Sequence, residues 1–476
     1  MIMKTETTHL PTESRLKRWG SLLKQAILGS EQDYTHGSID KAIVLLAIPM
    51  ILEMAMESLF AVVDMFFVAQ ISVAAVATVG ATESVLTLIY SLGIGLSSAA
   101  TAMVARRVGE GKRKAASFAA GQTIIIALVL SVLIAVPGYF YADDILHLMI
   151  KDPAVAEYGA PFTRLMFVAN LPILLLWMLN GVFRGAGDAS TAMRALWIAN
   201  GVNILLVPIF IFGWGPFPEM GLLGAAVATT TGRSIGVFYQ LWHLFGPGKI
   251  IHIRRAYLRV QTEIITRLLK LAAGGTGQYL ISSASWIFLM YILGQIGKDV
   301  QAGYTIAIRI MIFSILPCWG MANAASTLVG QNLGAGFPDR AEKSAWRAAF
   351  FNVVFMGVIG LCYAFFSPSL IGLFTDEPAV INAGALALRI MASGYIFYGS
   401  GMVIAQSING AGDTRTPTIL NFIFFWLVEI PLAAFLALWL DWGQTGVYWS
   451  IVIAESGMAL AAIWVFRKGK WKTTRI

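Results

Sequence analysis

Three carboxylates lie within one long apolar stretch of the chain. The run from Lys41 to Val68 exceeds the roughly 20 apolar residues that cross a bilayer, and it contains Glu53, Glu57 and Asp64. In a helix these acids share one face. Because a charge near the bilayer centre costs about 2.5 to 3.5 kcal/mol, that face must contact protein or water rather than lipid. We interpret it as a cation or proton site; the alternative is neutral acids, or acids paired with basic residues for packing alone.

A site of this kind can exchange a proton for another cation. A carboxyl group that is withdrawn from water and lies beside a second acid keeps a proton near neutral pH. Once the proton leaves, a lipophilic cation can bind against aromatic and methionine side chains. Candidates for such a lining are Phe60, Trp177, Tyr279, Trp286 and Met290, although aromatic residues at helical spacing more often face lipid or a core.

A proline precedes the acidic face in the same stretch. Pro49 cannot donate a hydrogen bond to the carbonyl of residue 45, so the helix is weakened below the acids. We hypothesise that Pro49 is a hinge, and that a change of charge on the acids favours a straight or a bent helix. A static kink is the alternative.

The composition is that of a helical membrane protein. Of 476 residues, 57% are hydrophobic and only 13% are charged, and 46 are glycines. The net charge of +8 is typical of basic cytoplasmic loops, so we predict no nucleic-acid partner. Cys318 and Cys362 fall within apolar segments, which predicts small buried side chains and no disulfide.

The polar N-terminal region, residues 1–38, has no short hydrophobic run with a small-residue cleavage site, so we expect no removable signal peptide. From Arg15 onward, apolar and basic residues recur at helical spacing. This segment is interpreted as a helix on an anionic membrane surface or as a loosely ordered soluble tail.

Twelve apolar spans follow, and none shows the alternation of a barrel strand, so we predict an all-α integral membrane protein. The spans are centred near Leu59, Leu92, Leu128, Leu174, Leu205, Gly232, Ser285, Pro317, Phe355, Met391, Leu427 and Ala454.

The charges of the connections predict the topology. Basic residues gather after spans two, six and eight, as at Arg106, Arg254 and Arg340, whereas odd-numbered connections are acidic or nearly neutral, as at Asp143 and Asp376. Since cytoplasmic loops are enriched in Lys and Arg, both basic termini are expected in the cytoplasm.

The two halves repeat each other at a fixed offset. Gly185-Ala-Gly-Asp188 returns as Gly410-Ala-Gly-Asp413, and 410 minus 185 is 225. The repeat predicts two six-helix lobes, related by an axis along the membrane normal. The predicted parts are a tail at 1–38, an N lobe at 39–245, a cytoplasmic linker at 246–262, a C lobe at 263–467 and a basic tail at 468–476.

The second copy lacks the acidic face. At the same offset, Glu53, Glu57 and Asp64 correspond to Gln278, Ser282 and Leu289, so ionic chemistry is expected in the first copy. The acids at membrane depth in the second copy are Glu429 and Glu455, interpreted either as accessory acids or as structural partners of arginines such as Arg389 and Arg309.

Several motifs occur in a specific order and spacing. They are VVDMFFVAQI with AVATVG, FRGAGD, NGVNILLVPIFIFG, GLLGAAVATT, and AIRI followed by ASTLVGQNLGAG. Together they resemble the multidrug and toxic compound extrusion (MATE) transporters over nearly the whole chain after the tail. The resemblance implies a V-shaped antiporter of twelve helices that exports bulky, often cationic compounds in exchange for protons or sodium.

The resemblance also implies site residues. Asp64 matches the family's acid in the first helix, Asn203 the Asn of the fifth-helix motif, and Thr229 the Thr of the sixth. Where many members carry Asp in the fifth helix, this chain has Val207. Glu57 is our candidate replacement for that missing acid. Glu83, early in span two, is expected either to join the cluster or to be a solvated acid near the helix end.

We favour the proton as the coupling ion. Sodium is a hard cation that needs several oxygen ligands, and Val207 removes one of them. A proton needs a single acid that retains it near neutral pH, which Glu57 beside Asp64 can supply. The alternative is a sodium cage rebuilt from Glu57, Asn203 and Thr229.

Other classes of protein fit the sequence less well. A lipid-precursor flippase of a related fold tends to carry a cationic cavity, an enzyme needs a catalytic set at membrane depth, and a channel does not need a duplicated plan. The five histidines lie in the tail or near connections. We therefore expect a monomeric transporter without a cofactor, with cationic or amphiphilic small-molecule substrates, in the bilayer of a bacterial inner membrane.

Overall fold

The computed structural model describes residues 15–29, 32–246 and 250–476, which contain helices and no strands. The first half comprises α1 (Arg15–Leu28), α2 (Ile39–Ala69), α3 (Val73–Gly109), α4 (Arg113–Met149), α5 (Pro153–Val168), α6 (Asn170–Gly185), α7 (Ala189–Phe212) and α8 (Leu222–Phe245). The second half comprises η1 (Arg255–Leu258), α9 (Thr262–Ile296), α10 (Lys298–Gly334), α11 (Pro338–Gly372), α12 (Pro378–Ser393), α13 (Tyr395–Gly410), α14 (Arg415–Asn421), η2 (Phe422–Glu429), α15 (Ile430–Ala434), η3 (Phe435–Trp439), α16 (Gly443–Arg467) and η4 (Lys470–Thr473).

Within the described residues, nine helices are individually long and apolar enough to cross a membrane. Two bent pairs also qualify: α5 with α6, bent by 41°, and α12 with α13, bent by 58°. The remaining predicted span, the sixth, is the 24-residue helix α8. The predicted all-α membrane fold is confirmed, and its fourth and tenth spans are broken helices.

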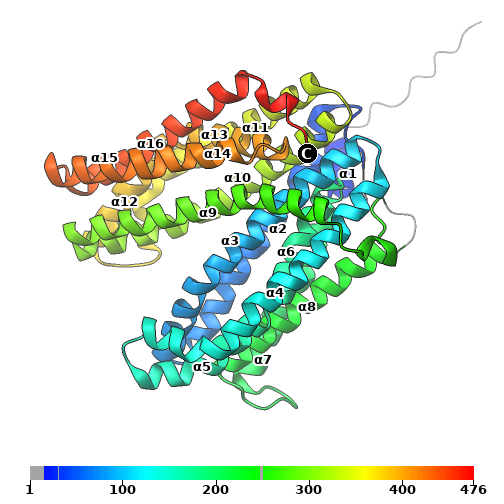
Figure 1. Cartoon of the computed structure of the whole chain (residues 1–476). Coiled ribbons are helices and arrows are strands. Elements are labelled where there is room, and N and C mark those ends of the chain that lie inside the picture. Colours follow the sequence, from blue (N-terminus) through cyan, green and yellow to red (C-terminus); the bar gives the residue numbers. More distant parts are fainter. Residues whose placement is uncertain (1–14, 30–31, 247–249) are drawn as a thin grey trace, which may run out of the picture.

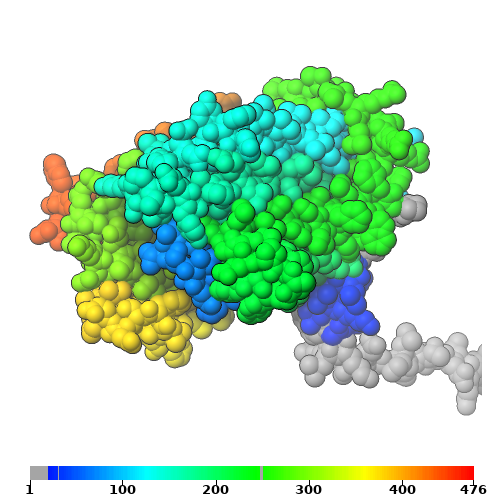
Figure 2. All heavy atoms as spheres, turned by 90° about the horizontal axis from the view of Figure 1, so that it is seen from below, coloured from blue at the N-terminus to red at the C-terminus, as the bar shows by residue number. Residues whose placement is uncertain are grey.

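The helices form two lobes that diverge like the arms of a V (Figure 1). We name α2–α8 the N lobe and α9–α16 the C lobe. Helix α3 packs against α9 and α2 packs against α10 across the seam. The approach is close at Gly95, where a Cβ atom would overlap the Thr276 hydroxyl group. In the space-filling view from below, the cyan and green atoms of the N lobe adjoin the yellow-green atoms of the C lobe, and blue atoms of the N lobe lie between the green and the yellow-green and yellow regions (Figure 2).

The internal repeat is visible in a pair of capped turns. Gly187 and Gly412 both have left-handed backbone angles, with φ of 83° and 94°, which favour glycine. The aspartate after each glycine lies just before the next helix and binds its first turn: Asp188 is the N-cap of α7, and Asp413 lies two residues before α14. Asp188 accepts a hydrogen bond from the Thr191 backbone N–H at 3.1 Å, as Asp413 does from the Thr416 N–H. The repeated Gly-Ala-Gly-Asp motif is therefore a helix–turn–helix joint.

The narrow end of the V is held together by polar contacts. Gln331 of α10 donates to the Gly185 carbonyl at 3.1 Å and accepts from the Tyr34 backbone N–H at 3.2 Å. Arg347 of α11 binds Asp40 of α2 at 2.7 Å. Helices α1 and η4 also lie at this end (Figure 1). Because α1 and η4 lie at the same end, the chain between them runs along the length of the lobes an even number of times.

The eleventh span departs from regular α-helix. It contains two π-helical segments, η2 and η3, separated by the single turn α15. A π-helical turn contains an extra residue and changes the direction of the side chains that follow it. Glu429 is the last residue of η2 and lies one position before α15.

The two cysteines differ in environment. Both are free, Cys318 is buried and Cys362 is exposed. The prediction that both side chains are buried is therefore wrong for Cys362, because its position on α11 lies on the outer surface of the bundle. Asn352 on the same helix instead points inward, with its amide 2.7 Å from the Cys318 sulfur.

Candidate functional site

We name Glu53, Glu57 and Asp64, on one face of α2, the acidic stripe. Its first acid, Glu53, is neutralised inside the N lobe. Glu53 is fully buried and accepts a hydrogen bond from Asn180 at 2.7 Å. Arg184, on the same helix as Asn180, binds both carboxylate oxygens of Glu53. A buried carboxylate that receives a bidentate guanidinium and an amide donor has its charge compensated.

The second acid has the same kind of partner. Arg233 of α8 binds Glu57 with an Nη2–Oε1 distance of 2.7 Å, and Asn200 donates to Glu57 at 2.9 Å. Arg233 is 5% exposed, and its guanidinium lies 4.9 Å from the ring centroid of Phe60. Phe60 therefore contacts a protein cation, a geometry in which an aromatic face stabilises positive charge.

The third acid has no ion-pair partner among the described residues. Asp64 Oδ1 is buried and has no hydrogen-bond partner in the part of the chain that the structure describes. The charges of Glu83 and Arg233 are close enough to act on Asp64, while Glu83 itself is exposed. A buried carboxyl oxygen without a partner is costly unless the group carries a proton or binds a ligand.

The motif residues of the fifth and sixth spans meet in the same lobe. Asn203 donates to the Thr229 hydroxyl at 2.9 Å, and its own Oδ1 is buried with no hydrogen-bond partner among the described residues. Val207, one turn further along α7, is fully buried in an apolar cluster that includes Phe210 and Leu222. Val207 thus contributes apolar packing, not a carboxylate, to this part of the lobe.

Sequence reasoning missed the two arginines. Glu53 and Glu57 do face protein rather than lipid, as predicted, but they are paired with basic residues, which was the alternative interpretation. Arg184 and Arg233 lie within apolar spans, and a charge at membrane depth requires a partner. The sequence therefore indicated that Arg184 and Arg233 need acidic partners, but it did not indicate which acids these are.

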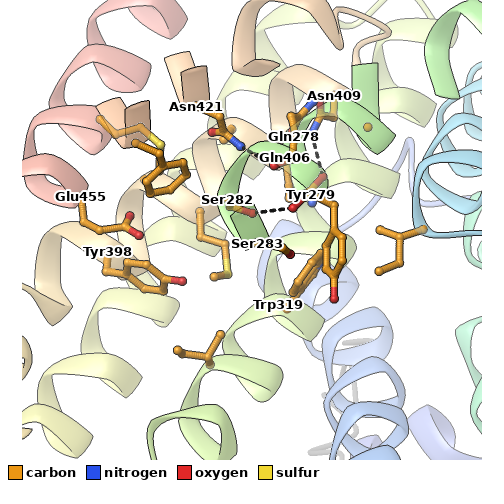
Figure 3. Close-up of a pocket in the computed structure, with 18 of the residues that line it drawn as sticks. Gln278, Tyr279, Ser282, Ser283, Trp319, Tyr398, Gln406, Asn409, Asn421 and Glu455 are labelled. Carbon is orange, nitrogen blue, oxygen red and sulfur yellow. Dashed lines mark hydrogen bonds between the residues drawn. The ribbon is translucent and has the colours of Figure 1, made fainter. Parts of the chain in front are cut away.

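The C lobe holds a cavity of about 360 Å³ (Figure 3). It is lined mainly by α9, α10, α13 and α16, with Ile94 and Ser98 contributed by α3 of the N lobe. Of the five predicted lining residues, Tyr279 and Trp286 line this cavity. The other three have different neighbours: Phe60 lies against Arg233, Trp177 lies against Tyr90, and Met290 packs against a C-lobe apolar cluster.

The repeat relates this cavity to the ion pairs of the N lobe. At the offset of 225 residues, the Glu53–Arg184 pair becomes Gln278 and Asn409, whose amides exchange hydrogen bonds of 3.0 and 3.1 Å. Glu57 and Arg233 become Ser282 and Met458, which face the cavity. Where the N lobe is filled by charged side chains, the C lobe has smaller or neutral ones and an open volume.

The C-lobe acids are not paired with arginines among the described residues. Glu429 is 1% exposed, and the Oε2 atoms of Glu429 and Glu455 are both buried without a hydrogen-bond partner in the described part of the chain. The alternative interpretation, in which Arg389 and Arg309 are their partners, is therefore wrong, because neither arginine forms an ion pair with them. Glu455 lines the cavity, where Figure 3 shows its carboxylate on the same side as Tyr398.

Pro49 lies where the lobes touch. It is buried inside α2, which continues as a single helix through it. A Cβ atom on Gly320 of α10 would come within 2.9 Å of the Met50 carbonyl group. The glycine thus allows α10 to approach the backbone of α2 beside the proline.

A protein-family model described as MatE matches residues 49–209 and again residues 276–435. This chain belongs to the MatE family. The double match follows the internal repeat, with one copy in each lobe. Members of the MatE family are membrane transporters rather than enzymes, so this is a multi-pass transporter of the multidrug efflux family with small-molecule substrates.

The MatE family relationship covers the full fold. The chain is 26% identical to the "Probable multidrug resistance protein YoeA" of Bacillus subtilis, over 94% of this chain and 97% of that protein. It superimposes on a MATE crystal structure in the straight conformation with a TM-score of 0.86, at 25% identity, covering 95% of this chain and 99% of that one. A MATE crystal structure in the bent conformation matches with a TM-score of 0.85, at 25% identity, covering 95% and 97%.

Proposed function

We propose that this transporter is an antiporter that exports bulky, cationic or amphiphilic compounds in exchange for protons. The proposal rests on the difference between Asp64 and the other two acids of α2. Glu53 and Glu57 are neutralised by arginines, whereas Asp64 on the same helix has a buried oxygen with no hydrogen-bond partner in the described parts of the chain. Asp64 is therefore the acid of the stripe that is left to bind and release a cation.

The surroundings of Asp64 favour a proton over sodium. A sodium ion needs several oxygen ligands. Glu57 is engaged by Arg233, and the position of Val207 is filled by apolar packing. Asn203 and Thr229, which bind each other, are the remaining oxygen donors for a cage. A proton needs only the carboxyl group.

Alternating access requires one helix to respond to the charge on Asp64. Pro49 lies four turns before Asp64 on α2 and beside the seam with α10. We infer that Pro49 is the hinge, and that protonation of Asp64 favours one of two shapes of α2. The existence of solved relatives described as straight and as bent supports a family fold with two such states.

The substrate is proposed to enter the C-lobe cavity. Tyr279 and Trp286 offer aromatic surface to it, and Met402 and Met458 offer adaptable apolar surface. Since Ile94 and Ser98 close one side, a substrate there contacts both lobes. Four other predicted site residues belong to the N lobe, as Asp64 does, and are not among the described residues that line this cavity: Glu53, Asn203, Thr229 and the exposed Glu83.

The transporter is proposed to lie as a monomer in a bacterial inner membrane, with both termini in the cytoplasm. The basic segment around Arg254 and the narrow end of the V then face the cytoplasm. The boundaries proposed for the two lobes are residues 39–245 and 263–467, joined by residues 246–262.

Export of ethidium from proteoliposomes tests the coupling ion. Ethidium is trapped inside, and pH and sodium gradients are imposed separately. The proposal predicts export that follows an inwardly directed proton gradient, without sodium on either side. Export that follows sodium at equal pH, and that stops without it, would overturn proton coupling and leave the family assignment intact.

A further inference from the structure

Among the described residues, a further pair of buried acids lies in the C lobe. Glu429 comes from η2 and Glu455 from α16, and their negative charges are close enough to repel each other. A small cavity of about 40 Å³ is lined by both acids. Each carboxyl group has a buried Oε2 without a partner in the described chain. Both oxygens are thus available to an occupant of this space.

The groups that face these acids are neutral. Tyr304 comes from α10, and Tyr395 and Tyr398 come from α13; all three line the small cavity. No Lys, Arg or His is among the described residues that line either C-lobe cavity. This is the opposite of the N lobe, where each of the first two acids of α2 has its own arginine.

Two carboxylates without a cation cannot both remain ionised in such a place. The cost of removing two like charges from water is lowered when the pair holds one proton. A metal ion is a poorer occupant, since the described residues contain no group of three or more ligating side chains. Glu429 is directed into the cluster from a π-helical turn, a distortion that is frequent at functional sites.

We propose that Glu429 and Glu455 form a second proton-binding site, so that each transport cycle exchanges two protons for one monovalent substrate cation. This inference rests on the proton-coupled antiport proposed above. One proton is carried at Asp64 and the other is shared by the C-lobe pair. Two protons enter as one cation leaves, so one positive charge moves inward in each cycle.

The geometry connects this second proton to the substrate. Glu455 lines the small cavity and also the larger cavity of about 360 Å³. Trp286 and Tyr398 are likewise shared by the two spaces. A cation bound in the larger cavity therefore lies beside Glu455, where its charge replaces that of the shared proton. The proton leaves to water as the cation binds.

The response to membrane potential distinguishes an exchange of one proton per substrate cation from an exchange of two. One-for-one exchange moves no net charge, so an imposed potential has no effect on it. With two protons, each 100 mV of inside-negative potential adds about fifty-fold to the ethidium gradient that export can reach. Wild-type proteoliposomes loaded with ethidium are given a potassium diffusion potential at equal pH. A passive leak would move ethidium in the opposite direction, into the negative interior.

The variants assign the response to the pair. Glu455→Gln is expected to retain export driven by a pH gradient and to lose the response to potential, and Glu429→Gln is a second variant of the same site. Glu263→Gln, at an exposed acid of α9, is the matched control and should respond as wild type does.

The outcomes separate the two proposals. Wild-type export that follows a pH gradient but ignores potential overturns the second site and leaves proton antiport standing. A Glu455→Gln protein with the full wild-type response to potential also overturns it. A response that requires sodium assigns the pair to sodium and contradicts the shared proton. Wild-type protein that does not respond to a pH gradient refutes the proposed function itself.

Discussion

Arg233 binds Glu57 through an Nη2–Oε1 contact of 2.7 Å, from a helix 176 residues further along the chain. Because of this contact, Glu57 is part of an ion pair and is not free to exchange a cation. Three acids share one helix face, but arginines neutralise two of them and leave Asp64 without such a partner among the described residues. The N lobe therefore separates structural charge from exchangeable charge along a single helix.

Replacement of Asp64 should abolish transport. Asp64→Asn removes the proton-binding carboxyl group while it preserves size, so we expect loss of drug resistance in a sensitised host with normal membrane expression. Glu455→Gln should have a smaller effect, since it removes one of two coupling sites. Asp144→Asn, at an exposed acid near the end of α4, is the control. Normal export by Asp64→Asn would show that the N-lobe site is wrong.

The Glu53–Arg184 pair should be structural. Arg184→Asn leaves a buried carboxylate without its cation and should cost about 3 to 5 kcal/mol in the free energy of unfolding. The double variant Glu53→Gln/Arg184→Asn copies the Gln278–Asn409 pair of the C lobe and should recover most of that loss. Thermal unfolding of the detergent-solubilised variants measures both effects. A double variant as unstable as the single one would show that the two lobes do not tolerate the same pair.

Pro49 should affect motion more than binding. Pro49→Ala restores the missing backbone donor, so α2 should favour one shape, and export should slow while ethidium binding is retained. Binding is followed by fluorescence and export by proteoliposome assay. Structures of the wild type at low and high pH are the complementary test. If α2 has the same shape in both, Pro49 is a static kink.

The orientation of the transporter is testable by labelling. In a Cys362→Ala background, which removes the exposed native thiol, cysteines at Ser21 or Lys470 should resist an impermeant reagent in intact cells. A cysteine at Glu219, in the connection between α7 and α8, should react. Labelling of Ser21→Cys or Lys470→Cys from outside would invert the topology and place the narrow end of the V outside the cell.

The architecture could be predicted because it follows from local pattern. Apolar length and the repeat at 225 residues predicted the spans and the two lobes, and the shared face of Glu53 and Asp64 followed from helical periodicity. The break between α12 and α13 was not predicted, because both segments are apolar and the sequence does not fix the angle between them.

The partners of the acids could not be predicted in the same way. Arg184 lies 131 residues from Glu53, and only the packing of α6 against the interior of the lobe brings them together. The cavity is equally non-local, since its lining comes from several helices of the C lobe and from α3. The orientation of Glu429 depends on the π-helical segment η2, which the apolar sequence does not reveal.

Proton release on substrate binding is the most direct test of Asp64 as the coupling acid. Ethidium is added to detergent-solubilised protein in weak buffer with a pH indicator, while its fluorescence reports binding. We predict that the wild type releases protons as it binds ethidium, and that Asp64→Asn, which still binds, releases about one proton fewer per molecule. Equal release by the wild type and Asp64→Asn, at equal binding, would contradict the account.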